Sequence, residues 1–67
     1  MYEIYKINKD ETLSHIKHLN NFEEVCAWLL DDYYYKYELV KIVNAQTGNF
    51  RDYKLADDKW IPINRGG

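Results

Sequence analysis

Cysteine and histidine are the side chains that most readily serve as nucleophiles, bases or metal ligands, and the chain has one cysteine and two histidines. Cys26 falls inside an apolar helical pattern, where a thiol lacks the exposure and the neighbouring base that catalysis needs. His15 and His18 would point to opposite faces of a strand or share one side of a helix. No second cysteine or carboxylate pair stands at zinc-site spacing. We therefore expect Cys26 in the core, both histidines on the surface and no metal.

Carboxylates are the other candidates for chemistry, and several come as adjacent pairs at 23–24, 31–32 and 57–58. General acid and base catalysis needs two carboxylates in different environments across a cleft, which sequence neighbours on an exposed face do not provide. The chain also has no glycine-rich phosphate loop and no nucleophile elbow. We therefore predict a protein that is not an enzyme and binds no cofactor.

The element that carries Cys26 is a predicted helix over residues 22–35. Asn21 is a favourable N-cap, and Glu24 stands at the third helical position, which gives a capping-box arrangement. Apolar residues recur along this helix at the spacing of one buried face. The residues of this expected core face are Phe22, Val25, Cys26, Leu29, Leu30 and Tyr33.

Strand patterns surround the helix. Alternating or β-branched apolar residues predict strands over 2–8, 37–44 and 50–55, and a short edge or terminal strand over 60–63. Residues 13–19 fit a strand or a helix, and we favour the strand, because only two asparagines separate this segment from the next helix. The expected fold is α+β, with a small antiparallel sheet of four to five strands packed on one helix. Its order, ββαββ, is one that a β-grasp would also have.

Length and composition fit one small domain. The 67 residues are 46% hydrophobic and 30% charged, which is too apolar for a disordered chain and too polar for a membrane protein. A single cysteine excludes a disulfide-stapled scaffold and fits a reducing compartment. No stretch is long and apolar enough for a membrane span. We expect a compact domain over residues 1–64, a flexible tail over 65–67, and a cytoplasmic location without membrane contact.

The outer side of the predicted helix carries large aromatic residues beside acidic ones. At about 100° per residue, Trp28 and Tyr35 fall on the same side as Glu24 and Asp31, away from the expected core face. Aromatic anchors ringed by charges are typical of protein interfaces. The alternative is that Trp28 folds against a strand as part of the core. The residues of this predicted binding surface are Glu24, Trp28, Asp31, Asp32, Tyr34 and Tyr35.

These observations favour a module that binds another protein. The acidic residues predict a larger partner with a basic surface patch, and the net charge of −2 makes direct nucleic-acid binding unfavourable. In general style the chain resembles small phage-encoded proteins that inhibit host defences, including anti-CRISPR proteins. That resemblance implies an inhibitor or regulator that acts by occupying a partner surface.

A different function follows from the last residues, where Gly66 and Gly67 close the sequence. A terminal diglycine after a final strand resembles ubiquitin-like modifiers and the β-grasp sulfur carriers, and residues 55–61 are similar to the stretch that precedes the tail in those carriers. The resemblance implies activation of the terminal glycine as an adenylate. The sequence departs from that family where the turn glycine is missing and where Pro62 interrupts a strand that is central in the β-grasp.

A third function, weak binding of single-stranded nucleic acid, rests on aromatic residues that could stack on bases. Tyr5, Phe50 and Tyr53 are the candidates on the predicted sheet. Glu38 and Asp52 offset the basic residues of the second hairpin, so the chain lacks the basic track that such binders normally have. We therefore rank this function last.

Overall fold

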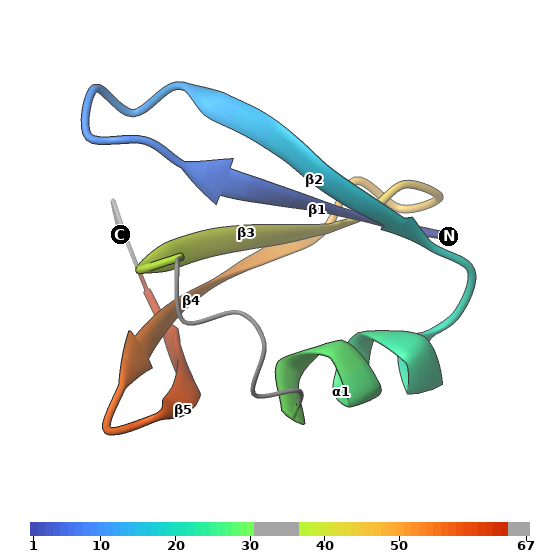
Figure 1. The fold of residues 1–67 in the computed structure, drawn as a ribbon. Helices are drawn as coiled ribbons and strands as arrows, with labels where there is room; N and C mark the ends of the chain where they lie inside the picture. Colours follow the sequence, from blue (N-terminus) through green and yellow to red (C-terminus); the bar gives the residue numbers. More distant parts are fainter. Residues whose placement is uncertain (31–36, 65–67) are drawn as a thin grey trace.

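The computed structural model describes residues 1–30 and 37–64 of the chain. These residues form five strands and one helix (Figure 1). The arrangement confirms an α+β fold in which a small antiparallel sheet accompanies a single helix. In chain order the elements are β1 (Tyr2–Ile7), β2 (Leu13–Leu19), α1 (Phe22–Leu30), β3 (Leu39–Asn44), β4 (Phe50–Ala56) and β5 (Lys59–Ile63).

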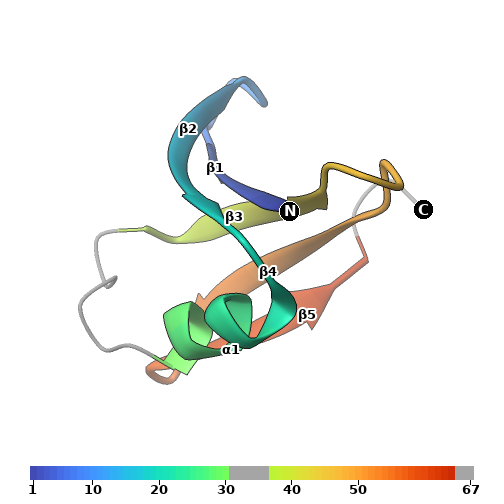
Figure 2. The same ribbon diagram turned by 90° about the vertical axis from the view of Figure 1, so that its right-hand side faces the viewer.

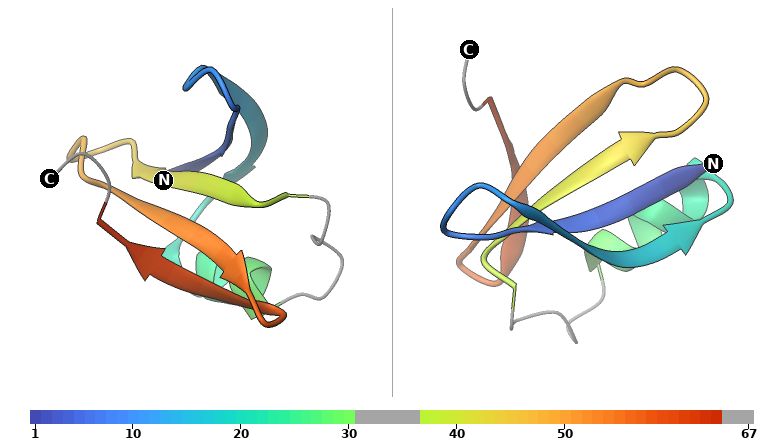
Figure 3. Two further views of the ribbon diagram at one scale, coloured as in Figure 1. Left: turned by 90° about the vertical axis from the view of Figure 1, so that its left-hand side faces the viewer. Right: turned by 90° about the horizontal axis from the view of Figure 1, so that it is seen from above.

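The strands form one sheet in the order β2-β1-β3-β4-β5, and every neighbouring pair is antiparallel. α1 follows the β1–β2 hairpin and lies against one face of the sheet (Figure 2). The strands change direction progressively from β2 to β5, so the sheet is strongly twisted (Figure 3). β5, which contains Pro62, lies at an edge, as predicted from the missing N–H of proline. A carrier-type β-grasp has its last strand in the centre, so this strand order departs from that resemblance.

Local sequence patterns account for the strands and for the β3–β4 turn. Residues 13–19 form a strand, which confirms the favoured alternative. The turn depends on Gly48, whose φ of +79° is a left-handed conformation that glycine adopts without strain. The Gly48 N–H donates to the Asn44 carbonyl at 2.8 Å, and Asn44 Oδ1 accepts from the Gln46 N–H at 3.0 Å. These bonds satisfy backbone groups that the turn would otherwise leave unpaired.

α1 begins where the sequence predicts. Asn21 Oδ1 accepts a hydrogen bond from the backbone N–H of Glu24 at 2.9 Å, and the Asn21 carbonyl accepts one from the Val25 N–H at 3.3 Å. The first bond is the expected N-cap, which satisfies a donor that has no partner within the helix. The described part of α1 ends at Leu30, so the predicted extent of the helix to residue 35 reaches beyond the described residues.

The face that α1 buries differs from the predicted one. Val25 and Trp28 are buried, whereas Phe22 and Leu30, both expected in the core, are exposed. At about 100° per residue, the buried face is rotated by roughly 80° from the predicted one. The reason is that apolar residues cover most of this short helix, so periodicity leaves its rotation open. The indole of Trp28 removes more apolar area from water than its neighbours do, which favours the observed rotation.

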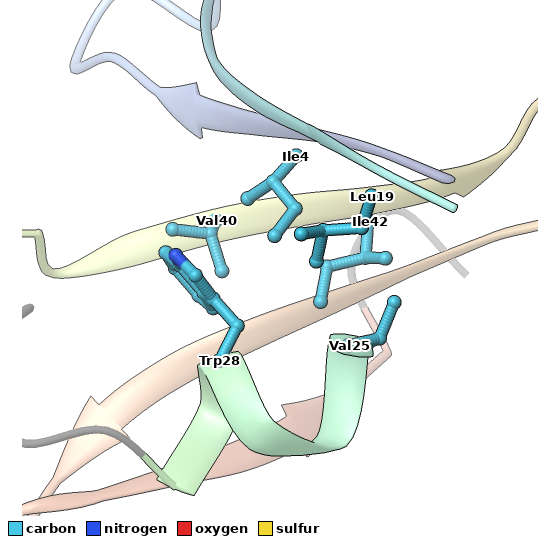
Figure 4. Close-up of a cluster of buried hydrophobic side chains, with 6 residues drawn as sticks. All are labelled: Ile4, Leu19, Val25, Trp28, Val40 and Ile42. Carbon is cyan, nitrogen blue, oxygen red and sulfur yellow. The ribbon is translucent and has the colours of Figure 1, made fainter. Parts of the chain in front are cut away.

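The core lies between α1 and the sheet (Figure 4). Partly buried hydrophobic residues pack around it, among them Leu29 of the predicted stripe. Cys26, also expected there, is half-buried. The buried residues of the cluster are Ile4, Leu19, Val25, Trp28, Val40 and Ile42.

The β1–β2 pairing is irregular at Ile16. Tyr5 pairs with His15 and Ile4 pairs with Lys17, so Ile16 is an extra residue on β2, a β-bulge. A bulge interrupts the alternation of side chains between the two faces of a strand. Ile16 packs against the core cluster as a result, and residues three apart on either side of it can share one face.

Candidate protein-binding surface

Trp28, the expected anchor of the outer helix face, lies in the core. Only 4% of its surface is exposed. Its ring stacks on Trp60 of β5, with centroids 5.7 Å apart and an angle of 26° between the ring planes. Trp28 is therefore not available as an interface anchor. It folds against a strand instead, which was the alternative predicted from the sequence. Burying the indole against a second indole lowers the free energy of the folded state more than leaving it in water would.

The other residues of that predicted surface are not brought together by the described part of the chain. Glu24 is half-buried, and its backbone N–H satisfies the Asn21 cap. The remaining site residues fall within positions 31–36 and 65–67, which lie outside the described residues, so their roles stay predictions. The residues that lie outside the described part are Asp31, Asp32, Tyr34, Tyr35, Gly66 and Gly67.

A groove opens on the helix side of the sheet, between the first turn of α1 and strands β3 and β4. We call it the aromatic groove, and its volume is about 390 Å³. Val25 and Ile42, both core residues, form its floor, and Figure 4 shows them in the space between α1 and β3. The lining residues are Tyr2, Phe22, Val25, Ile42, Asn44, Asn49, Phe50, Arg51 and Tyr53.

Phe22, on the α1 side of the aromatic groove, is largely open to solvent. It is 59% exposed. Its ring packs at a tilt against Tyr2, with centroids 6.1 Å apart and an interplanar angle of 52°. An apolar side chain of this size gains free energy when it leaves water. An exposed ring beside an apolar groove therefore marks a surface suited to contact with another molecule.

The composition of the aromatic groove resembles the centre of a protein interface. Four of its nine lining residues are aromatic, one is arginine, and none is lysine, aspartate or glutamate. The whole chain, in contrast, is 30% charged. Interfaces are enriched in aromatic residues and arginine and depleted in lysine, glutamate and aspartate at their centres. The groove thus matches a protein-binding surface in the types of residue it has and in those it lacks.

Phe50 is held in place by Lys41 of the neighbouring strand. Lys41 Nζ lies 3.8 Å from the centroid of the Phe50 ring, which is a cation–π contact. The same Nζ lies 3.2 Å from Asp52 Oδ1. Because Asp52 is only 5% exposed, water screens this ion pair less than it screens a surface pair. Lys41 pairs with Tyr5 and with Asp52, so these contacts hold the Phe50 ring on the face of the sheet away from α1, and Phe50 borders the groove only as the first residue of β4.

The face of the sheet away from α1 carries a second cluster, centred on Glu3. His15 Nε2 donates to Glu3 Oε1 at 2.7 Å, and His18 Nδ1 donates to Glu3 Oε2 at 2.5 Å. The hydrogen bond from His18, followed by that from His15, lowers the pKa of the Glu3 carboxyl below its usual value. Both histidines are exposed, as expected. They share one face of β2, contrary to the expectation for a regular strand, because of the bulge at Ile16.

The Glu3 cluster joins two strands and does not form a metal centre. One ring nitrogen of each histidine is hydrogen-bonded to a carboxylate oxygen of Glu3. Within residues 1–30 and 37–64, no group of three or more His, Cys, Asp or Glu side chains is placed to hold a metal ion. Tyr5 extends the cluster, since its ring meets that of His15 edge to face with centroids 5.3 Å apart. These contacts fasten β2 to β1 at the edge of the sheet.

The three aromatic residues considered for base stacking do not share one face. Tyr53 packs against the core cluster on the helix side of the sheet. Tyr5 pairs with Lys41 across β1 and β3 and contacts His15 on the other side of the sheet. Successive bases of a single strand stack on a continuous platform. The described structure offers no such platform from Tyr5, Phe50 and Tyr53 together.

Phe22, predicted in the core, is the groove residue that the sequence pattern placed wrongly. It directly follows the N-cap Asn21, so it occupies the first turn of α1, where the helix reaches the rim of the sheet. A large apolar residue at the end of a helix is a sequence feature that could have indicated exposure. Its position beside the groove depends on the packing of α1.

Comparisons with protein-family models, with curated proteins and with solved structures found no match to this chain. Its candidate function therefore rests on its own residues. No helix in the described ranges has the length and apolar character needed to cross a membrane.

Proposed function

We propose that this chain is a small non-enzymatic module that binds another protein through the aromatic groove, and that it inhibits or regulates this partner by occupying its surface. The lining of the groove is the observation that carries the proposal, because it combines four aromatic residues and an arginine with no lysine or acidic residue. The proposed class of function is the same as the one predicted from the sequence. The proposed contact surface differs, because it is the aromatic groove and not the outer face of the helix.

The energetics of the groove support this role. Phe22 is more than half exposed, so a partner that covers its ring gains up to about 2 kcal/mol. The floor of Val25 and Ile42 belongs to the packed core, and a rigid floor limits the entropy lost on binding. A few anchors of this kind supply most of the affinity of a typical interface.

The remaining parts of the proposal come from the sequence. The module acts in the cytoplasm, where the free thiol of Cys26 stays reduced, and it needs no cofactor. Phage-encoded anti-defence proteins are the class of small regulators that it resembles in general style. A basic patch on the partner stays a prediction, since it depends on Asp31 and Asp32.

Partner capture with matched variants tests the proposal. The immobilised wild-type protein and its Phe22→Ala and Leu30→Ala variants are incubated with a lysate of the organism that encodes the chain, and retained proteins are identified by mass spectrometry. Leu30 is the control, because it is 82% exposed on α1 but does not line the groove. A partner should be retained by the wild type and by Leu30→Ala, and lost with Phe22→Ala.

The affinity for that partner then measures the contribution of the Phe22 ring. Titration calorimetry should show binding weakened about 30-fold by Phe22→Ala, which corresponds to about 2 kcal/mol. Unfolding curves of the variants check that the fold is intact. A partner that binds Phe22→Ala as tightly as it binds the wild type would contradict the proposal.

The carrier function receives no support from the strand order, because β5 lies at an edge of the sheet. Gly66 and Gly67, on which that function depends, lie outside the described residues. Removal of Gly67 distinguishes the two functions, since a carrier would lose adenylation while a groove-binding module would keep its partner.

A further inference from the structure

We infer that the aromatic groove takes an extended acidic segment of its partner, in which a bulky apolar side chain is followed closely by a carboxylate. This inference rests on the proposed function and names the chemistry of the bound segment. Its basis is the placement of one cation without a salt bridge, Arg51, beside the apolar floor of the groove, because Arg51 pairs with the floor residue Ile42 across β3 and β4.

Among the described residues that line the aromatic groove, Arg51 alone is charged at neutral pH. It lies on β4 between Phe50 and Asp52, and its side chain is exposed. In the described part of the chain it makes no salt bridge, whereas the nearby Lys41 is bound to Asp52 at 3.2 Å. Lys41 therefore neutralises Asp52, and the guanidinium of Arg51 is left for a ligand. A planar guanidinium binds a carboxylate through two parallel hydrogen bonds.

The apolar part of the groove sets the second requirement. Its floor of Val25 and Ile42 lies next to the rings of Tyr2, Phe22 and Tyr53. A volume of about 390 Å³ is at the small end of the range for ligand pockets, about 300–1,000 Å³. It therefore suits one or two large side chains of a peptide and not a whole domain.

The two ends of the groove differ in charge, which orients the segment. Arg51 lies at the β4 end, and Phe22 lies at the end formed by α1. Glu23 and Glu24 follow Phe22 in the first turn of α1 without lining the groove. A carboxylate is therefore attracted to the β4 end and repelled from the α1 end, so a segment with its acid beside Arg51 is favoured in one direction.

A charge-reversal selection tests this inference. A displayed library of random peptides is selected on the wild-type protein, on Arg51→Glu and on Lys54→Glu. Lys54 is the matched control, because it is an exposed cation on the same strand that does not line the groove. We expect peptides enriched in aspartate or glutamate beside an aromatic or large aliphatic residue on the wild type and on Lys54→Glu. Arg51→Glu should select lysine or arginine at that position.

A synthetic peptide from the selection measures how much the acidic residue contributes to the affinity. Replacing its key aspartate or glutamate with the corresponding amide should weaken binding to the wild type about tenfold, as measured by fluorescence anisotropy. The same replacement should have little effect on binding to Arg51→Ala. Amide spectra of each variant, recorded by NMR, verify that the fold is unchanged.

The outcomes separate this inference from the proposed function. Peptides that require Phe22 but show the same acidic preference on the wild type and on Arg51→Glu would overturn the acidic segment and leave the groove as the binding site. Peptides unaffected by Phe22→Ala, or a selection that enriches none, would contradict the proposed function itself.

Discussion

Trp28 of α1 and Trp60 of β5 stack with their ring centroids 5.7 Å apart and their planes inclined by 26°. The pair connects the helix to the last strand, two elements that share no other described aromatic contact. Since Trp28 is 4% exposed while Trp60 is half-buried, the stack closes one end of the core. It also fixes the rotation of α1, and this rotation turns Phe22 out to the aromatic groove.

Replacing Trp28 with alanine should destabilise the domain by about 3–5 kcal/mol, because it leaves a cavity and removes the stack on Trp60. A loss of this size is a large fraction of the stability of a small domain, so the variant should be partly unfolded. Leu30→Ala is the control, with an expected change within about 0.5 kcal/mol. Urea unfolding followed by fluorescence measures both, and a loss below about 1 kcal/mol for Trp28→Ala would place Trp28 at the surface.

Replacing the N-cap Asn21 with alanine should cost about 1 kcal/mol, because the Glu24 N–H loses its bond to Asn21 Oδ1. Asn21→Asp should retain most of the stability, since a carboxylate also accepts that bond and suits the positive end of the helix dipole. The neighbouring, exposed Asn20→Ala is the control. Denaturant midpoints give the comparison, and equal losses for Asn21→Ala and Asn21→Asp would contradict the cap.

Replacing Gly48 with alanine should destabilise the β3–β4 hairpin by about 1 kcal/mol, because φ of +79° is costly for a residue with a Cβ. A Cβ at this position meets no atom within 4 Å, so the cost comes from the backbone alone. Gly48→Asn should be milder, since asparagine tolerates left-handed φ. Thermal unfolding of the two variants checks the order, and a reversed order would show that backbone strain does not control this turn.

The Glu3 cluster predicts a specific dependence of stability on pH. Hydrogen bonds from His18 and His15 lower the pKa of Glu3 below its ordinary value of 4.5 in the folded state. A carboxyl whose pKa is lower in the folded state binds protons more weakly than in the unfolded state. Its stabilisation is therefore present above pH 4.5 and is lost as the pH falls through the lowered folded pKa.

Glu3→Gln isolates this contribution. The variant should be less stable than the wild type at neutral pH, and the difference should shrink toward zero as the solution is acidified below pH 4.5. Glu38→Gln, an exposed acid on the approach to β3, controls for the loss of one negative charge. Denaturant titrations at a series of pH values provide the measurement. A difference between Glu3→Gln and the wild type that stays constant over the acid range would exclude the linkage to Glu3.

Several elements follow from local residues alone. Asn21 starts α1 because its side chain caps a free N–H, a short-range effect that a few residues determine. Gly48 makes the β3–β4 turn because only a residue without a Cβ adopts its φ freely. Local residues also account for β3, whose β-branched side chains favour a strand, and for the position of Pro62 on an edge strand. Such features require no knowledge of distant parts of the chain.

The candidate site was decided by the tertiary structure. In α1 the apolar residues surround most of the helix, so the period of the sequence permits several buried faces, and contact between Trp28 and Trp60 selects one. The extra residue Ile16 is a matter of strand register, and it places His15 and His18 on the same carboxylate. Phe22 lies beside the groove for a related reason, because long-range packing depends on the total area buried by the whole chain and no local pattern encodes it.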